Sequence, residues 1–120
     1  MSQAEKVYTE AEARAKAAAE LPTWEWREGK LRRTFKTGGW PHTLMLVNAI
    51  GYTAEAAWHH PDLNVSWAEV QVKLMTHSAG GITDKDFELA KRIEEVATWR
   101  PEEGAALAGF ERGMKKKWTR

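Results

Sequence analysis

Residues 55–61 read Glu55-Ala-Ala-Trp-His59-His60-Pro61 and separate a helix-like segment from a strand-like one. A residue that precedes proline is driven out of the α region, so this sequence predicts that the helix ends at His60. Two adjacent side chains on a continuous helix would point about 100° apart, whereas at a helix end both imidazoles can turn toward one pocket. Histidine titrates near neutral pH, which makes this pair a candidate proton-transfer site.

The sequence before this stretch predicts a helix followed by a β-hairpin. Thr9 and Glu12 form a capping-box pattern for a helix that runs to Leu21, where a proline stops it. Two runs with alternating apolar and polar residues, 23–27 and 30–36, flank a Glu-Gly pair that suits a tight turn. We therefore expect two antiparallel strands here.

Two further helices and two further strands complete the predicted order. Pro41 suits the first turn of the second helix, whose apolar residues recur at helical spacing as far as the two histidines. Alternation over 63–67 and 69–77 predicts a third and a fourth strand, with His77 on the polar face of the fourth. Thr83 then caps a third helix, which ends before Pro101.

These elements predict an α+β domain with the order α-β-β-α-β-β-α and a four-stranded antiparallel sheet covered on one face by helices. We assign this domain to residues 1–100. Residues 101–120 form a tail in which glycines disfavour helix. A helical stripe in the tail still permits one weak helix carrying Leu107, Phe110, Met114 and Trp118.

Composition limits the classes of protein to consider. A chain of 120 residues and 13.6 kDa suits a single domain. Eighteen Lys and Arg against seventeen Asp and Glu leave a net charge of +1, which gives no electrostatic case for nucleic acid or a membrane surface as partner. The absence of cysteine and of an apolar run of about 20 residues fits a cytoplasmic protein. Seven tryptophans exceed what one small core can hide, so we expect a homodimer or homotetramer.

The spacing of the chemically active residues resembles a known family. Glu55-x3-His59-His60-Pro61, followed in register by Trp67, His77 and Asp86, is similar to the motif of the pterin-4a-carbinolamine dehydratases. The resemblance covers about residues 20–97. It implies an enzyme that removes water from a 4a-hydroxytetrahydropterin to give a quinonoid dihydropterin. It implies neither a metal nor an organic cofactor, since the pterin is the substrate.

The resemblance also implies roles for individual residues. His59 and His77 would transfer the protons, and His60 would mainly bind the substrate. Glu55 would orient a histidine or bond the amino-pyrimidine edge of the pterin. The expected substrate-binding residues are Glu55, Pro61, Thr76, Ser78 and Asp86.

Several of these residues also have a purely structural interpretation. His59, His60 and Glu55 could be solvated groups at a helix end. Thr83-x-x-Asp86 is itself a capping-box pattern, so Asp86 could be a helix cap, and the two roles can coexist.

Two other functions compete with the dehydratase. The first is a non-enzymatic scaffold of the same fold, because the family includes a dimerisation cofactor of a transcription factor and relatives of Rubisco assembly factors. The second is a zinc site made by the three histidines and a carboxylate, although consecutive histidines close a tetrahedral site poorly. The sequence departs from the family at Trp58, where a polar residue is usual, and in the start of the second helix and the tail. Trp58 could reshape the mouth of the pocket.

Overall fold

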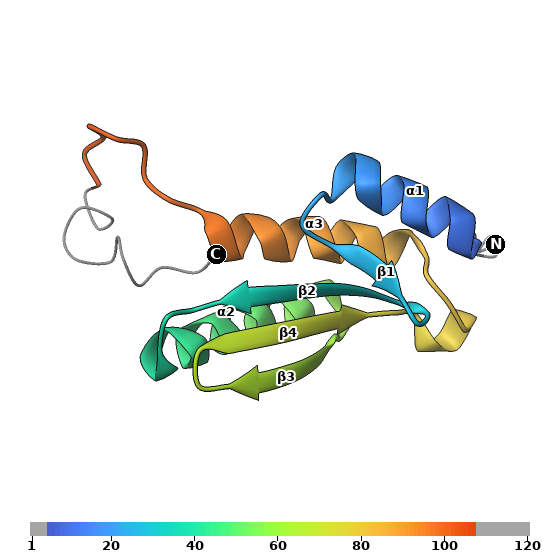
Figure 1. The fold of residues 1–120 in the computed structure, drawn as a ribbon, viewed down its shortest axis with the longest axis horizontal. Coiled ribbons are helices and arrows are strands. Elements are labelled where there is room, and N and C mark those ends of the chain that lie inside the picture. Colours follow the sequence, from blue (N-terminus) through green and yellow to red (C-terminus); the bar gives the residue numbers. More distant parts are fainter. Residues whose placement is uncertain (1–4, 108–120) are drawn as a thin grey trace.

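The structure, a computed structural model, describes residues 5–107 and has the predicted order of elements (Figure 1). The elements are α1 (Glu10–Glu20), β1 (Glu25–Arg27), β2 (Lys30–Lys36), α2 (Trp40–Ala57), β3 (Asp62–Ser66), β4 (Glu69–Leu74), the 3-10 turn η1 (His77–Ala79) and α3 (Asp84–Thr98). The prediction of an α+β fold is therefore confirmed.

The four strands form one antiparallel sheet in the order β1-β2-β4-β3. The β1–β2 hairpin turns through Glu28 and Gly29, which have φ values of 51° and 79°. Positive φ at both central residues gives the turn the twist that two antiparallel strands need. The short strand β1 and the strand β3 form the two edges of the sheet.

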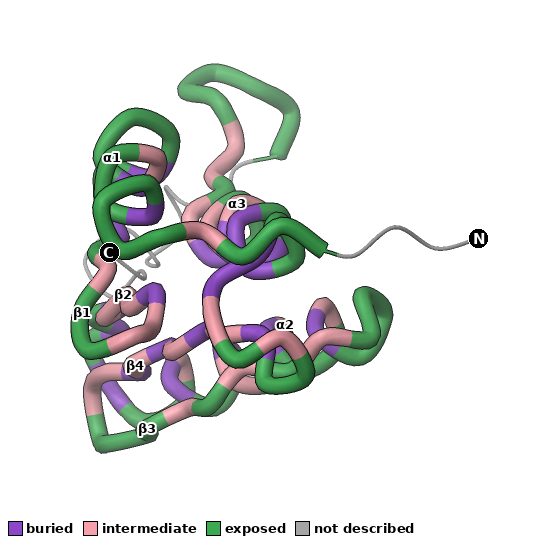
Figure 2. The backbone as a smooth tube through the Cα atoms, turned by 90° about the vertical axis from the view of Figure 1, so that its right-hand side faces the viewer, coloured by how far each residue is buried: buried purple, intermediate pink, exposed green. Residues whose placement is uncertain are grey.

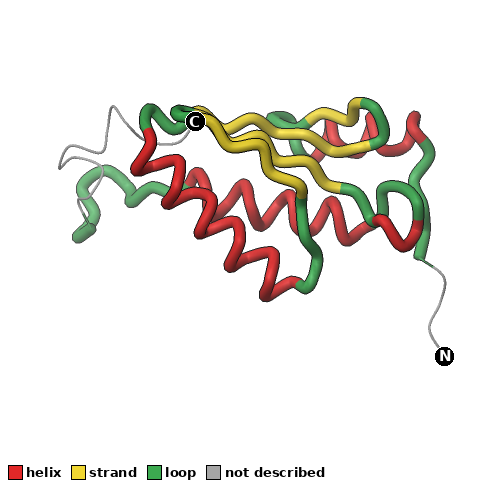
Figure 3. Tube along the Cα trace, turned by 90° about the horizontal axis from the view of Figure 1, so that it is seen from below, coloured by secondary structure: helices red, strands yellow, loops and turns green. Residues whose placement is uncertain are grey.

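The hydrophobic core lies between the helices and one face of the sheet (Figures 2 and 3). In the two central strands, Leu31 pairs with Leu74 and Phe35 pairs with Val70, and all four side chains are buried. The helices contribute further buried side chains, namely Ala13, Ala17, Leu46, Ile50, Ala54, Phe87, Leu89, Ala90, Ile93 and Ala97. Alternate residues of the same strands are polar, which leaves the other sheet face uncovered.

Helix α2 ends at Ala57, so the prediction that it reaches His60 was wrong. Trp58 adopts the left-handed conformation, with φ 51° and ψ 45°, and its N–H bonds the carbonyl of Glu55. The N–H of His59 bonds the carbonyl of Ala54 at 3.1 Å. These two bonds form a Schellman motif, which ends the helix at Ala57. The helix therefore ends before it reaches His60, the residue that precedes Pro61.

Strand β4 ends at Leu74, which corrects the prediction that His77 lies on its polar face. The pairing of β4 with β2 ends at Leu74, where Leu31 is the partner. Beyond that point Thr76 forms an isolated bridge with Gly81, and His77 begins η1. Neither β2 nor β3 pairs with the chain beyond Leu74, and the chain turns through η1 toward α3.

The structure describes the tail only as far as residue 107. Residues 101–107 contain turns and no helix, and the rest of the predicted weak helix lies outside the described residues. None of the helices within residues 5–107 has the length and apolar character needed to cross a membrane.

A partly buried ion pair connects α3 to β2. Glu94 accepts hydrogen bonds from Arg33 Nε at 2.9 Å and Nη2 at 3.0 Å, and from Trp24 Nε1 at 2.8 Å. Burial alone would raise the pKa of Glu94, but the hydrogen bonds and charge of Arg33 outweigh it and hold the pKa below its ordinary value of 4.5. This carboxylate therefore stabilises the fold when ionised.

We expect Glu94→Gln to lower the free energy of unfolding at neutral pH by about 1–2 kcal/mol, because the amide carries no charge and its –NH2 group cannot accept a hydrogen bond from Arg33. The folded-state pKa lies below the unfolded one, so this stabilisation is present above about pH 4.5 and is lost as pH falls through the folded pKa. The difference between variant and wild type in urea unfolding should therefore shrink at about pH 3. Glu88→Gln, an exposed change on the same helix, is the control. An equal difference at both pH values would contradict the prediction.

Candidate functional site

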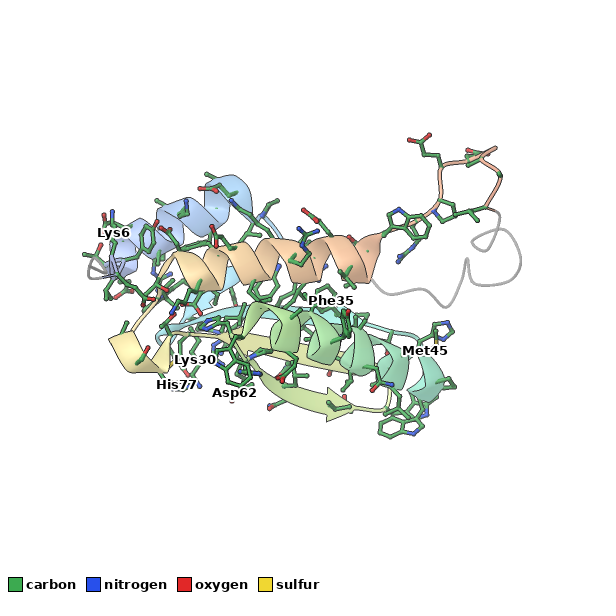
Figure 4. The ribbon with its side chains drawn as sticks, turned by 180° about the vertical axis from the view of Figure 1, so that it is seen from behind. Lys6, Lys30, Phe35, Met45, Asp62 and His77 are labelled. Carbon is green, nitrogen blue, oxygen red and sulfur yellow. The ribbon has the colours of Figure 1, made fainter. Side chains whose placement is uncertain are left out.

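The candidate site residues lie in the last turns of α2, in the loop that follows α2, in and just before η1, and in the first turn of α3. These segments meet at one end of the sheet. Asp62, the first residue of β3, pairs with Lys73 near the end of β4. The end of α2 and η1 lie at this same end of the molecule (Figure 1). Figure 4 places His77 and Asp62 there and Met45 near the opposite end of α2. The end of the sheet thus holds both histidine-bearing segments.

His59 is hydrogen-bonded to a buried carboxylate. Its Nε2 lies 2.7 Å from Oδ1 of Asp86, in the first turn of α3. The side chain of Asp86 is 0% exposed and that of His59 is 13% exposed. A buried carboxylate with a defined partner fixes the orientation of the imidazole that it contacts.

Two threonines hydrogen-bond Oδ2, the oxygen of Asp86 that does not contact His59. The hydroxyl of Thr76 donates to Oδ2 of Asp86 at 2.8 Å, and the backbone N–H of Thr83 donates to the same oxygen at 2.9 Å. The Thr76 hydroxyl has only one hydrogen, which Asp86 takes, so the 2.8 Å contact between the two threonine hydroxyls has Thr83 as donor. The carboxylate therefore accepts three hydrogen bonds in a fixed geometry.

Asp86 is both a helix-capping residue and the hydrogen-bond partner of His59. Its bond with the N–H of Thr83 is one half of the capping box predicted for α3, which is confirmed. Its other oxygen faces His59. Of the two interpretations of Thr83-x-x-Asp86 that the sequence left open, the helix cap is confirmed. The role of Asp86 in the site stays a prediction.

The pairing with Asp86 determines which nitrogen of His59 carries the proton. An ionised carboxylate only accepts hydrogen bonds, so the Nε2 that faces it must be the donor. In a neutral imidazole the other nitrogen, Nδ1, then has the lone pair. His59 can consequently take up a proton at Nδ1 and release it there.

His60 belongs to a second, more exposed cluster. Its Nε2 lies 2.8 Å from Oε1 of Glu55, one turn back on α2. The Trp58 ring meets the His60 ring edge-on, with centroids 5.1 Å apart and planes at 82°. The structure thus gives Glu55 a histidine partner, and its role in orienting that histidine stays a prediction.

The remaining predicted residues differ in exposure. His77 and Ser78 are exposed in η1, and Pro61 is half-buried between the histidine pair and β3. Thr76 is 2% exposed, and its hydroxyl is occupied by Asp86. In this structure Thr76 therefore hydrogen-bonds Asp86, and Asp86 hydrogen-bonds His59.

A groove of about 930 Å³ runs between α2 and α3 and reaches the predicted site at His59. Its other lining residues include Tyr52, Lys85, Leu89, Arg92 and Val96. His60 and His77 are outside its lining. Sequence reasoning missed this groove because it depends on how two helices pack.

The described residues also bear on the zinc alternative. Within residues 5–107 there is no group of three or more His, Asp or Glu side chains arranged to hold a metal ion. His59 and His60 instead pair with separate carboxylates. The part of the chain that the structure describes therefore provides no ligand set for that alternative.

Known proteins resemble this chain over most of its length. Residues 6–96 match the profile of the family described as "Pterin 4 alpha carbinolamine dehydratase". A protein of Aquifex aeolicus named "Putative pterin-4-alpha-carbinolamine dehydratase" is 51% identical over 76 residues, which are 63% of this chain and 77% of that protein. A protein of the same name from Natronomonas pharaonis is 42% identical over 80 residues, 66% of this chain and 87% of the relative.

Two solved structures share the fold. The "transcriptional coactivator/pterin dehydratase" of Brucella melitensis aligns with a TM-score of 0.69 and 28% identity, covering 77% of this chain and 99% of the other. A pterin dehydratase-like protein described as a RuBisCO assembly factor of the alpha-carboxysome aligns with a TM-score of 0.53 and 18% identity, covering 64% and 89%. At that identity the second likeness concerns the fold alone.

Proposed function

The chain belongs to the pterin 4 alpha carbinolamine dehydratase family, and we propose that it acts in the cytoplasm as a dehydratase of 4a-hydroxytetrahydropterins. The observation that carries the proposal is the hydrogen-bonded chain from His59 through Asp86 to Thr76, the residue next to His77. It connects, through one buried carboxylate, the two segments that carry the proposed acid and base.

The reaction requires two proton transfers. The C4a–O bond breaks as the departing hydroxyl takes a proton and leaves as water, and a base removes the N5 proton. The N5 electron pair then forms the C4a–N5 double bond of the quinonoid dihydropterin. Positioned histidines suit both transfers, and such groups typically contribute about 10²–10⁴-fold each.

We assign these transfers to His59 and His77. His59 has Nδ1 available because Asp86 holds the proton on Nε2. His77 is exposed and can meet a substrate from solvent. His60, paired with Glu55, would bind the pterin, whose amino-pyrimidine edge offers hydrogen-bonding groups to both side chains. Pro61 and Ser78 would complete the rim of the site.

A stopped-flow measurement of dehydration tests the proposal directly. The 4a-hydroxytetrahydropterin is generated in the instrument, and its loss is followed with and without purified protein. We expect acceleration over the buffer-catalysed rate that depends on protein concentration. No acceleration with several 4a-hydroxypterins would reject the enzymatic function for those substrates.

We propose that the protein assembles into homodimers or homotetramers. Large apolar side chains are exposed on α2 and on the edge strand β3, including Leu44 (42% exposed), Met45 (55%), Tyr52 (80%) and Val65 (42%). The unpaired edge of β3 can accept another strand. Both features favour self-association.

Light scattering should give a mass that is a multiple of 13.6 kDa. We expect Val65→Lys, on the edge strand, to lower the mass without unfolding the protein, because a charge disfavours strand pairing there. Thr34→Lys adds the same charge to a central strand and serves as the control. A wild-type mass of 13.6 kDa would refute the expected assembly.

A scaffold function is the second candidate. It is favoured by the exposed apolar residues of α2 and by the Brucella relative, whose description includes a transcriptional coactivator. Under this alternative the partner would be a protein, and the chain would bind it without turning over a pterin. The stopped-flow assay separates the two, since a scaffold alone gives no acceleration.

A further inference from the structure

Trp58 has a backbone conformation that tryptophan rarely adopts. Its φ of 51° and ψ of 45° lie in the left-handed region, at the position of a Schellman motif where glycine or asparagine is usual. A bulky side chain there is strained, because its Cβ approaches its own carbonyl oxygen. Within residues 5–107 the other non-glycine residue with positive φ is Glu28, in a hairpin turn.

Burial does not compensate for this strain. The Trp58 side chain is 76% exposed, so it removes little apolar surface from water. Strained residues persist where the surrounding structure or a function requires them. The contacts of the indole ring indicate what that requirement is.

The left-handed turn brings Trp58 against His60. Residues two apart on a continuous helix do not face each other, but here the two rings are 5.1 Å apart in an edge-to-face arrangement. On its other side, His60 bonds Glu55 at 2.8 Å. The imidazole is thus held between an aromatic ring and a carboxylate.

This support matters because the Glu55–His60 pair is exposed. The two side chains are 67% and 51% exposed, and an ion pair or hydrogen bond at such a site contributes little by itself. Without the indole, the imidazole has other staggered rotamers open to it. The edge-to-face contact with the indole favours the rotamer in which the two rings meet.

We propose that Trp58 is a positioning residue that holds His60 in its bond with Glu55 and so presents His60 to the pterin. The inference rests on the proposed dehydratase function for the identity of the ligand. The geometric half, the ordering of His60 by Trp58, does not depend on that function. The two halves are therefore tested by different measurements.

The kinetic test compares Trp58→Asn with Trp58→Phe. Asparagine accepts the left-handed conformation and removes the ring, whereas phenylalanine retains an aromatic ring. For Trp58→Asn we expect a Tm a few degrees higher, since strain is relieved. We also expect KM to rise about 5- to 10-fold with kcat changed less than about twofold, while Trp58→Phe stays near wild type.

A double-mutant cycle shows whether Trp58 acts through His60. In a His60→Ala background, Trp58→Asn should have no further effect on KM, because the residue that it positions is already absent. An equal rise of KM with and without His60 would overturn the proposal. An unchanged KM in Trp58→Asn, or a changed mass in light scattering, which would make Trp58 a subunit contact, would also overturn it.

The geometric half is read by NMR of the His60 ring protons, independently of activity. In the wild type they should carry a ring-current shift from the indole, which Trp58→Asn removes and Trp58→Phe partly retains. Shifts that are equal in all three proteins would refute the ordering of His60. Wild-type protein with the expected shifts but no dehydration would refute the proposed function alone.

Discussion

His59→Ala and His77→Ala are each expected to lower kcat for 4a-hydroxytetrahydropterin dehydration by about 10²-fold or more, the usual scale for a positioned proton-transfer group. His60→Ala should instead raise KM, since its proposed role is binding. All three variants should fold, because His59 is only partly buried and His60 and His77 are exposed. Stopped-flow kinetics on each variant, with Tm as the check on folding, measure these effects.

The double variant His59→Ala/His77→Ala distinguishes one catalytic unit from two independent groups. We expect its loss of kcat to be smaller than the product of the two single losses, because residues that act as a unit are not additive. His42→Ala, in the first turns of α2 and outside the site, is the control for loss of a histidine. Full activity in either single variant would remove that histidine from the mechanism.

Asp86→Asn is expected to reduce both turnover and stability. An amide can accept through its oxygen but not through its nitrogen, so it cannot satisfy all three donors that now face the carboxylate. If the amide nitrogen faces His59, the proton of the imidazole moves to Nδ1 and the wrong tautomer is presented. We expect kcat to fall about 10²-fold or more, because the wrong tautomer removes a positioned proton-transfer group.

The stability effect has a separate cause. A buried donor left without an acceptor costs about 1–3 kcal/mol, which corresponds to a Tm lower by roughly 4 °C or more. Asp84→Asn removes another carboxylate of the same helical turn, one that bonds Tyr8, and is the matched control. Kinetics should be measured well below the Tm of the variant. A fall in Tm with kcat within about threefold of wild type would leave Asp86 as a helix cap only.

Most of the elements were predictable because their signals are local. The capping boxes at Thr9 and Thr83 and the turn at Glu28-Gly29 depend on residues within a few positions of one another. Alternating and helical patterns of apolar residues then identified each strand and helix, and the antiparallel α+β order followed. Local chemistry was sufficient at these points because neighbouring side chains alone satisfy the backbone groups concerned.

Two of the boundaries that differ from the prediction lie beside the site. The proline rule allowed a helix as far as His60, but a left-handed Trp58 ends α2 at Ala57, against the usual preference of tryptophan. Strand β4 ends at Leu74, the last residue that pairs with β2, although the alternation of apolar and polar residues continues to His77. The end of α2 depends on a backbone turn and the end of β4 on pairing between strands. The patterns of apolar and polar residues predict neither of them.

The sequence by itself determined the fold class, the family and the set of side chains that could carry the chemistry. Only the tertiary structure decided how they pair: His59 with Asp86, 27 positions away, Thr76 with Asp86, and His60 with Glu55 and Trp58. The sequence gives the type of each residue, and the type fixes which hydrogen bonds the side chain can donate or accept. The identity of its partner depends on the packing of α3 against α2 and the end of β4, because a hydrogen bond forms only where folding brings two groups to within about 3 Å.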